Sequence, residues 1–412
     1  MISDLKIRMG EALRLTGAGR LAEATALLQG LPQNAKSSEV SKGIKRESTT
    51  RAGRAGQLID MVPPRSASGL WTAPGMDTQE HNAALAEGVA PPHMTAALRE
   101  LLDRFGNRGS SWEIGGLAGH RSPEAKTPLP DGARFEEHAY ANEAGSRRYK
   151  LFVPSRYCGE PLPLVVMLHG CTQSPDDFAA GTRMNELAEE QSFLVAYPAQ
   201  SPSANSSKCW NWFNGEDQLR DTGEPSLIAG ITRQVMSNFA VNPTRVYIAG
   251  LSAGGAAAAI MGSAYPDLYA AIGVHSGLAC GAAKDLPSAF SAMRQGGSPP
   301  QATRPLLPTI VFHGDRDNTV SPLNGDQVIA QSKGGMKLHQ TMSRGQSAGG
   351  ISYTRTVYAD GSGSPVLEHW VLHGAGHAWS GGSPAGSYTD PRGPDASREM
   401  LRFFLERSAG RA

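Results

Sequence analysis

The chain has 412 residues, and its 39 Lys and Arg residues nearly balance its 38 Asp and Glu residues, which leaves a formal net charge of +1. This balance gives no strong electrostatic attraction to nucleic acids or to anionic membranes. No apolar run approaches the roughly 18 residues that a membrane-spanning helix needs. We therefore expect a globular protein with neither a nucleic-acid nor a membrane partner, built from one large domain and additional segments.

The first segment, residues 1–31, has apolar residues at helical spacing on both sides of a break at residues 16–19. This pattern predicts a helical hairpin. The hairpin would either form oligomers, direct the protein to a granule or dock a partner, or it would simply pack in solvent. The segment lacks the basic-then-apolar pattern of a signal peptide, so we expect a cytoplasmic protein, with export by another route left open.

The second segment, residues 32–132, is rich in Pro, Gly, Ser, Ala and charged residues. No apolar face persists along it, which predicts a mostly disordered linker. One short helix is expected near residues 95–105, where Leu98, Leu101, Leu102 and Phe105 would line up on one side.

The third segment, residues 133–412, alternates strand-like and helical patterns. The expected strands are 135–140, 148–153, 164–168, 193–197, 245–249, 270–275, 309–312 and 369–372, and the expected helices are 184–190, 227–239, 256–261, 288–294 and 396–405. This alternation favours an α/β domain with a mainly parallel sheet flanked by helices.

Ser252 lies in the sequence Gly250-Leu251-Ser252-Ala253-Gly254, between a β-type run and an alanine-rich helical run. This is the setting of a nucleophile elbow, a sharp strand-to-helix turn that raises a serine hydroxyl at the edge of a sheet. The two glycines leave room for the turn. Because a five-residue pattern also arises by chance in glycine-rich turns, the partners of Ser252 decide the interpretation.

Two later strand-to-loop junctions supply such partners. A serine hydroxyl is a weak nucleophile until a base takes its proton, and a carboxylate then orients that base. One junction carries Asp315 and Asp317, and the other ends on His377. In a parallel sheet both junctions lie at the same edge as Ser252. We assign His377 as the base and Asp317 as the orienting acid.

Neighbouring residues are rivals for these roles. Asp315 lies nearer the strand end, where it would instead cap or brace the loop. His373 ends its strand and could serve as a base or support one, whereas His369 alternates with apolar neighbours and is expected to be structural.

A negative charge that develops on a substrate oxygen needs N–H donors beside it. The apolar run 164–168 predicts a buried strand, and His169-Gly170-Cys171 opens the loop that follows. We expect the backbone N–H groups of Cys171 and Ala253 to be the two donors, and we expect His169 to brace the loop.

The four cysteines, Cys158, Cys171, Cys209 and Cys280, permit two disulfides in three alternative pairings. In a reducing cytoplasm we expect four free thiols. No C-x-x-C motif or histidine cluster suggests a metal site, and the chemistry needs no cofactor.

Aromatic residues gather at 209–214, which read Cys-Trp-Asn-Trp-Phe-Asn, and at Trp379, two residues after His377. Tryptophan rings suit sugar rings, aromatic acids or polyester chains. We expect Trp210, Trp212 and Trp379 to bind substrate, with a packed core corner as the alternative for the first two. Residues 380–384 are expected to form a loop at the mouth of the site, and residues 281–304 a partial lid.

Five of these pieces resemble the polyhydroxybutyrate depolymerase family of esterases, which is related to feruloyl and acetylxylan esterases. They are 169–173 (HGCTQ), 209–213 (CWNWF), 250–255 (GLSAGG), 313–317 (HGDRD) and 374–382 (GAGHAWSGG). The resemblance spans about residues 133–407. It implies an α/β-hydrolase fold, a serine esterase mechanism, and a triad of Ser252, Asp317 and His377. The preference for Asp317 over Asp315 comes mainly from this motif.

We therefore expect a serine carboxylesterase that hydrolyses short hydroxyalkanoate esters or oligomers through an acyl-enzyme. A feruloyl- or acetylxylan-type carbohydrate esterase is the alternative. A non-catalytic granule-binding protein that uses residues 1–30, and a peptidase or transferase on the same scaffold, are the interpretations from other classes.

Overall fold

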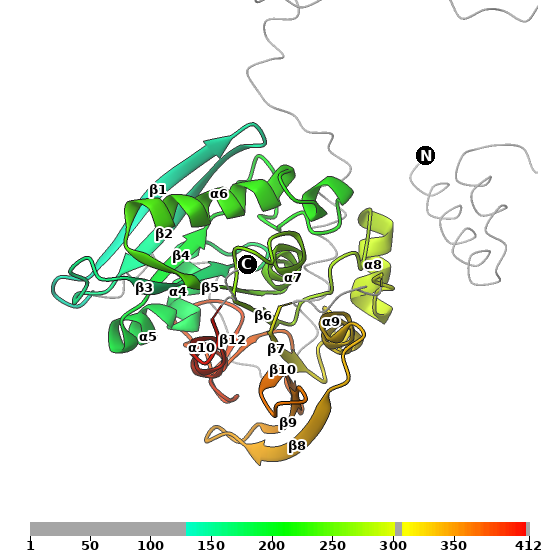
Figure 1. The fold of residues 1–412 in the computed structure, drawn as a ribbon. Helices are drawn as coiled ribbons and strands as arrows, with labels where there is room; N and C mark the ends of the chain where they lie inside the picture. The colour runs from blue at the N-terminus through cyan, green and yellow to red at the C-terminus, as the bar shows by residue number, and fades with distance from the viewer. Residues whose placement is uncertain (1–128, 301–306, 409–412) are drawn as a thin grey trace, which may run out of the picture. The chain divides into compact units, whose positions relative to one another are not determined.

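The computed structural model describes residues 129–300 and 307–408, so the hairpin expected in residues 1–31 and the helix expected near 95–105 lie outside the described residues. A ten-stranded sheet runs in the order β1-β2-β4-β3-β5-β6-β7-β10-β9-β8 (Figure 1). Its strands are β1 (Arg134–Asn142), β2 (Gly145–Val153), β3 (Leu162–Leu168), β4 (Leu194–Pro198), β5 (Val241–Leu251), β6 (Ala271–His275), β7 (Thr309–Gly314), β8 (His339–Gln346), β9 (Ser352–Ala359) and β10 (Pro365–Leu372). A separate two-stranded sheet joins β11 (Trp379–Ser380) to β12 (Thr389–Asp390).

The centre of the large sheet is parallel. Strands β4, β3, β5, β6, β7 and β10 run parallel to one another, whereas the pairings of β1 with β2 and β2 with β4 at one edge, and of β10 with β9 and β9 with β8 at the other, are antiparallel. Strand β3 is buried at every position. Parallel strands covered on both faces read as continuous apolar runs, which is why the sequence predicted this part of the sheet.

Helices cover both faces of the sheet (Figure 1). Helices α6 (Gly223–Asn238), α7 (Ala253–Ala264), α8 (Leu286–Gln295) and α9 (Leu323–Lys333) contribute to one buried cluster, and α4 (Pro175–Thr182), α5 (Met184–Gln191) and α10 (Ala396–Leu405) contribute to the other. Alternate residues of β3 join the two clusters: Val166 packs in the first and Val165 in the second. This layered arrangement is the expected α/β architecture.

The sequence analysis missed two strands of the large sheet, β8 and β9, the short strands β11 and β12, and the α-helices α4 and α9. Strand β8 pairs only with β9 and is exposed at nearly every position. A strand with no buried face has no apolar alternation, so its sequence looks like a polar loop. The eight expected strands all correspond to observed ones, with ends shifted by a few residues.

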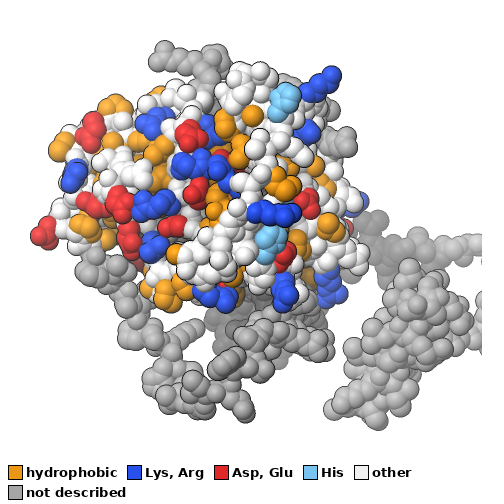
Figure 2. All heavy atoms as spheres, turned by 90° about the horizontal axis from the view of Figure 1, so that it is seen from below, with side chains coloured by type: hydrophobic (Ala, Val, Ile, Leu, Met, Phe, Trp, Pro, Cys, Tyr) orange, Lys and Arg blue, Asp and Glu red, His pale blue; other side chains and the backbone are white. Residues whose placement is uncertain are grey.

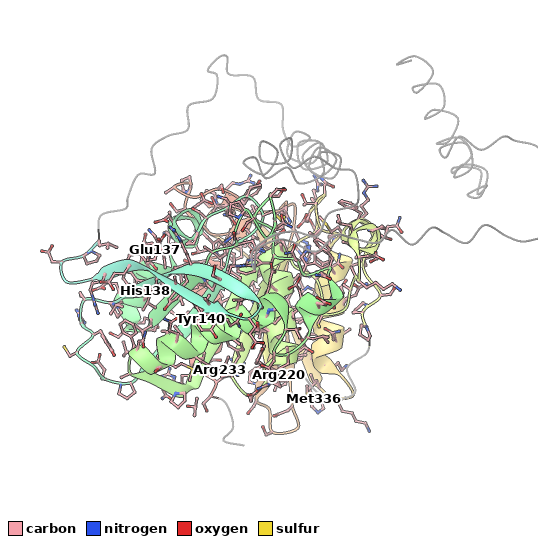
Figure 3. The ribbon with its side chains drawn as sticks, turned by 90° about the horizontal axis from the view of Figure 1, so that it is seen from above. Glu137, His138, Tyr140, Arg220, Arg233 and Met336 are labelled. Carbon is pink, nitrogen blue, oxygen red and sulfur yellow. A yellow bond between two sulfur atoms is a disulfide. The ribbon has the colours of Figure 1, made fainter. Side chains whose placement is uncertain are left out.

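The hairpin of β1 and β2 packs against α6, and one of its contacts is especially close. A side chain on Gly230 of α6 would collide with the ring of Tyr140 on β1. Figure 3 labels Tyr140 together with Glu137 and His138 of the same strand. Because Gly230 leaves room for this ring, α6 lies close to the sheet. The first turn of α6 carries Glu224, whose carboxylate bonds to Asn211 in the loop that carries Cys209.

The visible surface carries charges of both signs. Lys and Arg side chains are mixed with Asp and Glu side chains over the face shown in Figure 2, which fits the small net charge. No helix within residues 129–300 and 307–408 is long and apolar enough to cross a membrane.

Candidate active site

Ser252 lies between the end of β5 and the start of α7, in a backbone conformation that few residues adopt. Its φ is 57° and its ψ is −119°. Strain of this kind costs on the order of 1–3 kcal/mol and is common at functional sites. Close packing maintains the turn, because a side chain on Gly254 would collide with the carbonyl oxygen of Leu168, and one on Gly250 would collide with Gly254. The turn has the geometry expected of a nucleophile elbow.

The carboxyl ends of the parallel strands are joined to one another. Three backbone hydrogen bonds link them: Ser252 N–H to His275 O (2.9 Å), Ser276 N–H to Phe312 O (2.9 Å) and Asp315 N–H to Leu372 O (3.0 Å). These bonds connect the ends of β5, β6, β7 and β10 in spatial order. The loops that carry the serine, the aspartates and the histidines therefore begin at one edge of the sheet, where α/β proteins bind their ligands.

His377 and Asp317 are hydrogen-bonded. The distance from His377 Nδ1 to Asp317 Oδ2 is 2.7 Å, and the other carboxylate oxygen accepts the N–H groups of Thr319 and Val320 at 2.9 and 2.8 Å. The side chain of Asp317 is fully buried, while that of His377 is 12% exposed. With its proton held on Nδ1, the imidazole presents Nε2 as an acceptor, which is the tautomer that a general base requires.

The carboxylate of Asp317 stays ionised. Burial alone would raise its pKa, but the charge of His377 and hydrogen bonds from His313 and His377 outweigh burial and hold the pKa well below its usual range. His313 Nε2 donates to Val320 O at 2.9 Å and lies 3.4 Å from Asp317 Oδ2. Asp317 is thus an anion whose second oxygen is available to the imidazole.

The rival acid Asp315 pairs with the rival base His373 instead. Asp315 Oδ2 lies 2.9 Å from His373 Nδ1, Asp315 Oδ1 accepts the Gly374 N–H at 2.7 Å, and the two paired side chains are about 40% exposed. These bonds tie the aspartate loop to the start of the loop that carries His377. Asp315 therefore braces the loop, as the alternative interpretation held.

The loop after β3 passes beside Ser252. A side chain on Gly170 would begin 3.6 Å from the Cβ of Ser252. The N–H groups of Gly170 and Thr172 donate to protein acceptors. The N–H of Cys171, which stands between these two residues in the sequence, has no acceptor among the described residues. Ala253 is the first residue of α7, and the first N–H groups of a helix have no partner within it. Both expected oxyanion donors are therefore unengaged.

His169 braces this loop. Its Nδ1–H donates to Gly170 O at 2.7 Å, and its Nε2 accepts the Gln200 N–H at 3.1 Å. Burial lowers the pKa of His169 to about 4, so the ring is neutral near pH 7. Both nitrogens are occupied, which leaves this histidine no role in proton transfer and agrees with the expectation.

His275, which the sequence analysis did not single out, supports the site from β6. Its Nε2 accepts the N–H of Ser380, three residues after His377, at 3.0 Å. Burial lowers the pKa of His275 to about 3, which keeps it a neutral acceptor. His369, on β10, is likewise neutral because burial lowers its pKa to about 4, and its buried position agrees with a structural role.

Cys171 forms a disulfide with Cys209, 38 residues away in the sequence. The expectation of four free thiols is therefore wrong for this pair, while Cys158 and Cys280 are free. A count of four cysteines could not identify the pairing; the fold does so by placing the loop at residue 209 beside the one after β3. The cytoplasmic expectation stays a prediction.

The three tryptophans expected to bind substrate are buried. Trp210, Trp212 and Trp379 are 0%, 6% and 1% exposed. The indole N–H of Trp210 donates to His169 O at 3.1 Å, and that of Trp379 donates to Ser397 Oγ at 3.0 Å. This corrects the expectation of a substrate surface: the rings support the site loops from within the core, and apolar burial explains their clustering.

Glu224 is a second residue that the sequence did not reveal. Its buried carboxylate accepts hydrogen bonds from Gln200 Nε2, from the Asn211 N–H at 2.7 Å and from Asn211 Nδ2 at 2.8 Å. Arg147 lies 3.4 Å away, and burial raises the pKa of the carboxyl. The glutamate thereby fixes the loop that carries Cys209, and through the disulfide it supports Cys171. A single Glu in a helix gives no sequence signal for this role.

Replacing Cys209 with serine is expected to destabilise the protein and to lower kcat. Loss of a native disulfide typically costs about 2–5 kcal/mol, and a displaced Cys171 N–H would lower turnover by up to about 100-fold. Thermal melting and kcat with p-nitrophenyl butyrate measure the two effects. Cys158→Ser, which removes an exposed free thiol, is the matched control; equal behaviour of the two variants would contradict the prediction.

The expected lid contains α8, which is docked on α9. Asn324 Nδ2 donates to Ala292 O at 2.9 Å, and Gln327 Nε2 donates to Gly297 O at 2.7 Å. Residues 301–306 lie outside the described part, and a lid function stays a prediction. In the loop expected at the mouth of the site, Ser380 and Gly382 are buried, and the nearby exposed aromatic residue is Tyr388.

Residues 147–342 match the sequence model of the family described as esterase PHB depolymerase. This range includes Ser252 and Asp317, and His377 lies beyond it. Among curated relatives, the poly(3-hydroxyalkanoate) depolymerase C of Paucimonas lemoignei is 33% identical over 228 residues, which cover 52% of this chain and 54% of the relative. Feruloyl esterase B of Thermothelomyces thermophilus is 27% identical over 250 residues, which cover 55% of this chain and 82% of the relative. The chain thus spans about half the length of the depolymerase.

Among solved structures, the acetyl xylan esterase from Aspergillus awamori superposes with a TM-score of 0.52 at 20% identity, over 65% of this chain and 98% of that chain. The likeness concerns the fold, and it agrees with the α/β-hydrolase architecture expected from the sequence.

Proposed function

Since residues 147–342 match the family model described as esterase PHB depolymerase, we propose that the chain is a serine carboxylesterase with Ser252 as nucleophile, His377 as base and Asp317 as orienting acid. The observation that carries this proposal is the 2.7 Å hydrogen bond from His377 to the ionised Asp317, at the same sheet edge as the strained Ser252 turn. The family and the relatives support the ester bond as the target.

In the proposed mechanism, Ser252 Oγ attacks the ester carbonyl carbon while His377 Nε2 takes the hydroxyl proton. The N–H groups of Cys171 and Ala253 stabilise the oxyanion. The carbon–oxygen bond to the alcohol then breaks, and His377 returns its proton to the departing oxygen. Water adds to the acyl-enzyme through the same base, releases the acid and restores Ser252. Asp317 keeps the imidazole oriented throughout and stabilises its protonated form.

Short hydroxyalkanoate esters or oligomers are the proposed substrates, because a poly(3-hydroxyalkanoate) depolymerase is among the relatives. A feruloyl- or acetylxylan-type activity is the second candidate. It is favoured by the match to feruloyl esterase B, which extends over 82% of that relative, against 54% of the depolymerase.

The test pairs turnover with covalent labelling. The full chain is assayed with p-nitrophenyl esters, a methyl-capped 3-hydroxybutyrate dimer, methyl ferulate and acetylated xylo-oligosaccharides, and it is separately treated with a fluorophosphonate probe. We expect turnover of the dimer and a probe adduct on the Ser252 peptide. Preference for ferulate or acetylated sugars would select the second candidate. If neither turnover nor labelling is observed, a non-catalytic binding protein is favoured. Faster cleavage of matched amides would favour a peptidase.

A further inference from the structure

Tyr388 occupies an unusual place between β11 and β12. It is 47% exposed, and its φ is 52°, in the left-handed region that aromatic residues seldom adopt. Glycine would adopt this conformation without strain, and a polar residue would be better solvated at this exposure. Stability of the folded chain therefore does not explain why a tyrosine stands here, and strained residues of this kind are frequent where a ligand binds.

Two contacts place Tyr388 between the loops that flank Ser252. Its backbone oxygen accepts the N–H of Trp379, two residues after His377, at 2.7 Å. Its hydroxyl lies 3.2 Å from Oγ1 of Thr172, the residue after Cys171. Thr172 also has a positive φ, of 67°, and is exposed. Tyr388 thus connects the loop of the base with the loop of the proposed oxyanion hole, at their exposed rim.

A network of hydrogen bonds from the buried Gln173 side chain to more exposed residues holds this rim in place. Gln173 Nε2 donates to Asp177 Oδ2 at 2.8 Å and to Ser387 O at 3.1 Å. Ser387 in turn donates its N–H and its hydroxyl to Asp177, at 2.9 and 2.6 Å. Gln173 also accepts the Gly170 N–H through its Oε1, so one side chain fixes both the oxyanion loop and the residue before Tyr388.

The carboxylates near this rim have hydrogen-bond partners. The carboxylate of Asp177 is satisfied by the donors just described, and the carboxylate of Asp390 forms two hydrogen bonds with Arg392, at 2.9 and 2.8 Å. Tyr388 and Thr172 are both exposed at this rim. An aromatic face with a polar edge suits an uncharged chain that combines carbon segments and oxygen atoms.

We propose that Tyr388 and Thr172 form a substrate subsite, in which the tyrosine ring contacts the part of a neutral ester that extends beyond the scissile bond. The subsite rests on the proposed esterase function and deepens it. A very short ester would not reach the ring, whereas a longer acyl chain or a larger alcohol would. Tyr388 therefore sets specificity for size and takes no part in bond breaking.

The experiment compares wild type with Tyr388→Ala, Tyr388→Phe and Tyr388→Gly in two substrate series. One series lengthens the acyl chain of p-nitrophenyl esters from acetate to octanoate, and the other enlarges the alcohol of acetate esters from methyl to benzyl. For Tyr388→Ala and Tyr388→Gly we expect KM to rise roughly tenfold for the largest members of at least one series, with kcat and the smallest esters little changed. Tyr388→Phe keeps the ring and should retain most of the affinity.

The melting temperature distinguishes a substrate-binding role of Tyr388 from a purely structural role. Tyr388→Gly relieves the positive φ, so a recognition role predicts an unchanged or higher melting temperature together with the higher KM. Met342→Ala, which truncates an exposed apolar residue on β8, is the matched control and should leave both quantities unchanged. A lower melting temperature with an equal fall in kcat for every ester, or no change of KM in either series, would overturn the subsite. Absence of wild-type activity on all esters would instead overturn the proposed function.

Discussion

Replacing Ser252 with alanine is expected to lower kcat for ester hydrolysis by on the order of 10⁶-fold, with KM little changed. The variant cannot form an acyl-enzyme, and any residual rate would come from water activated beside the oxyanion donors. The surrounding structure should persist, because alanine preserves the backbone and the packing of Gly250 and Gly254. Steady-state assays with p-nitrophenyl butyrate measure the loss, and incubation with the fluorophosphonate probe should give no adduct.

Ser263→Ala is the matched control, since it removes the hydroxyl of an exposed serine on the same helix, α7. It should retain wild-type kcat. Ser252→Gly adds a second readout: it should be as inactive as the alanine variant but more stable, because glycine accepts a φ of 57° without strain. A Ser252→Ala variant that hydrolyses esters at the wild-type rate would exclude Ser252 as the nucleophile.

The sequence could predict the central sheet and the positions of the three proposed catalytic residues. Both depend on local residue patterns that are compatible with only one kind of structure. Continuous apolar runs such as residues 164–168 fit strands buried on both faces, and polar loops directly after such strands meet at one sheet edge. The spacing of Asp317 within its loop selected it over Asp315 by resemblance. The structure adds the physical distinction, since Asp317 is buried against His377 whereas Asp315 is exposed beside His373.

Features that depend on contacts between distant segments could not be predicted. The pairing of Cys171 with Cys209 requires two loops to lie together, and a compartment argument pointed to free thiols instead. The tryptophans gave an ambiguous signal, because a large apolar ring is equally suited to a core and to a ligand surface. Only burial decides between them, and here it decides for the core.

Residues in polar surroundings show even less of a sequence pattern from which their structure could be predicted. Strand β8 lies at the edge of the sheet with its side chains in solvent, so no alternation marks it. Tyr388 stands in a loop of small polar residues, and its positive φ is a property of the folded backbone that no residue pattern announces.

Replacing Asp317 with asparagine is expected to lower kcat by about 10⁴-fold while leaving the fold intact. The amide can donate a hydrogen bond to His377 Nδ1, which would shift the imidazole proton to Nε2 and remove the acceptor that Ser252 needs. The neutral side chain also no longer stabilises the protonated imidazole. Asp315→Asn is the matched comparison, because its partner His373 is exposed, and exposed pairs contribute at most about 1 kcal/mol, less than a tenfold effect. A larger loss of kcat in Asp315→Asn than in Asp317→Asn would make Asp315 the orienting acid.

Wild type and Asp317→Asn should also differ in how their stability depends on pH. Because the folded-state pKa of Asp317 lies well below its usual range, its ionised form stabilises the fold at every pH above about 3.9, the ordinary aspartate value. That contribution is lost only as the pH falls from this value towards the folded-state pKa. Wild type should therefore melt at a higher temperature than Asp317→Asn at neutral pH, and the difference should shrink in acid below pH 4. A difference that stays constant through this range would mean that packing, and not the charge of Asp317, maintains its contact with His377.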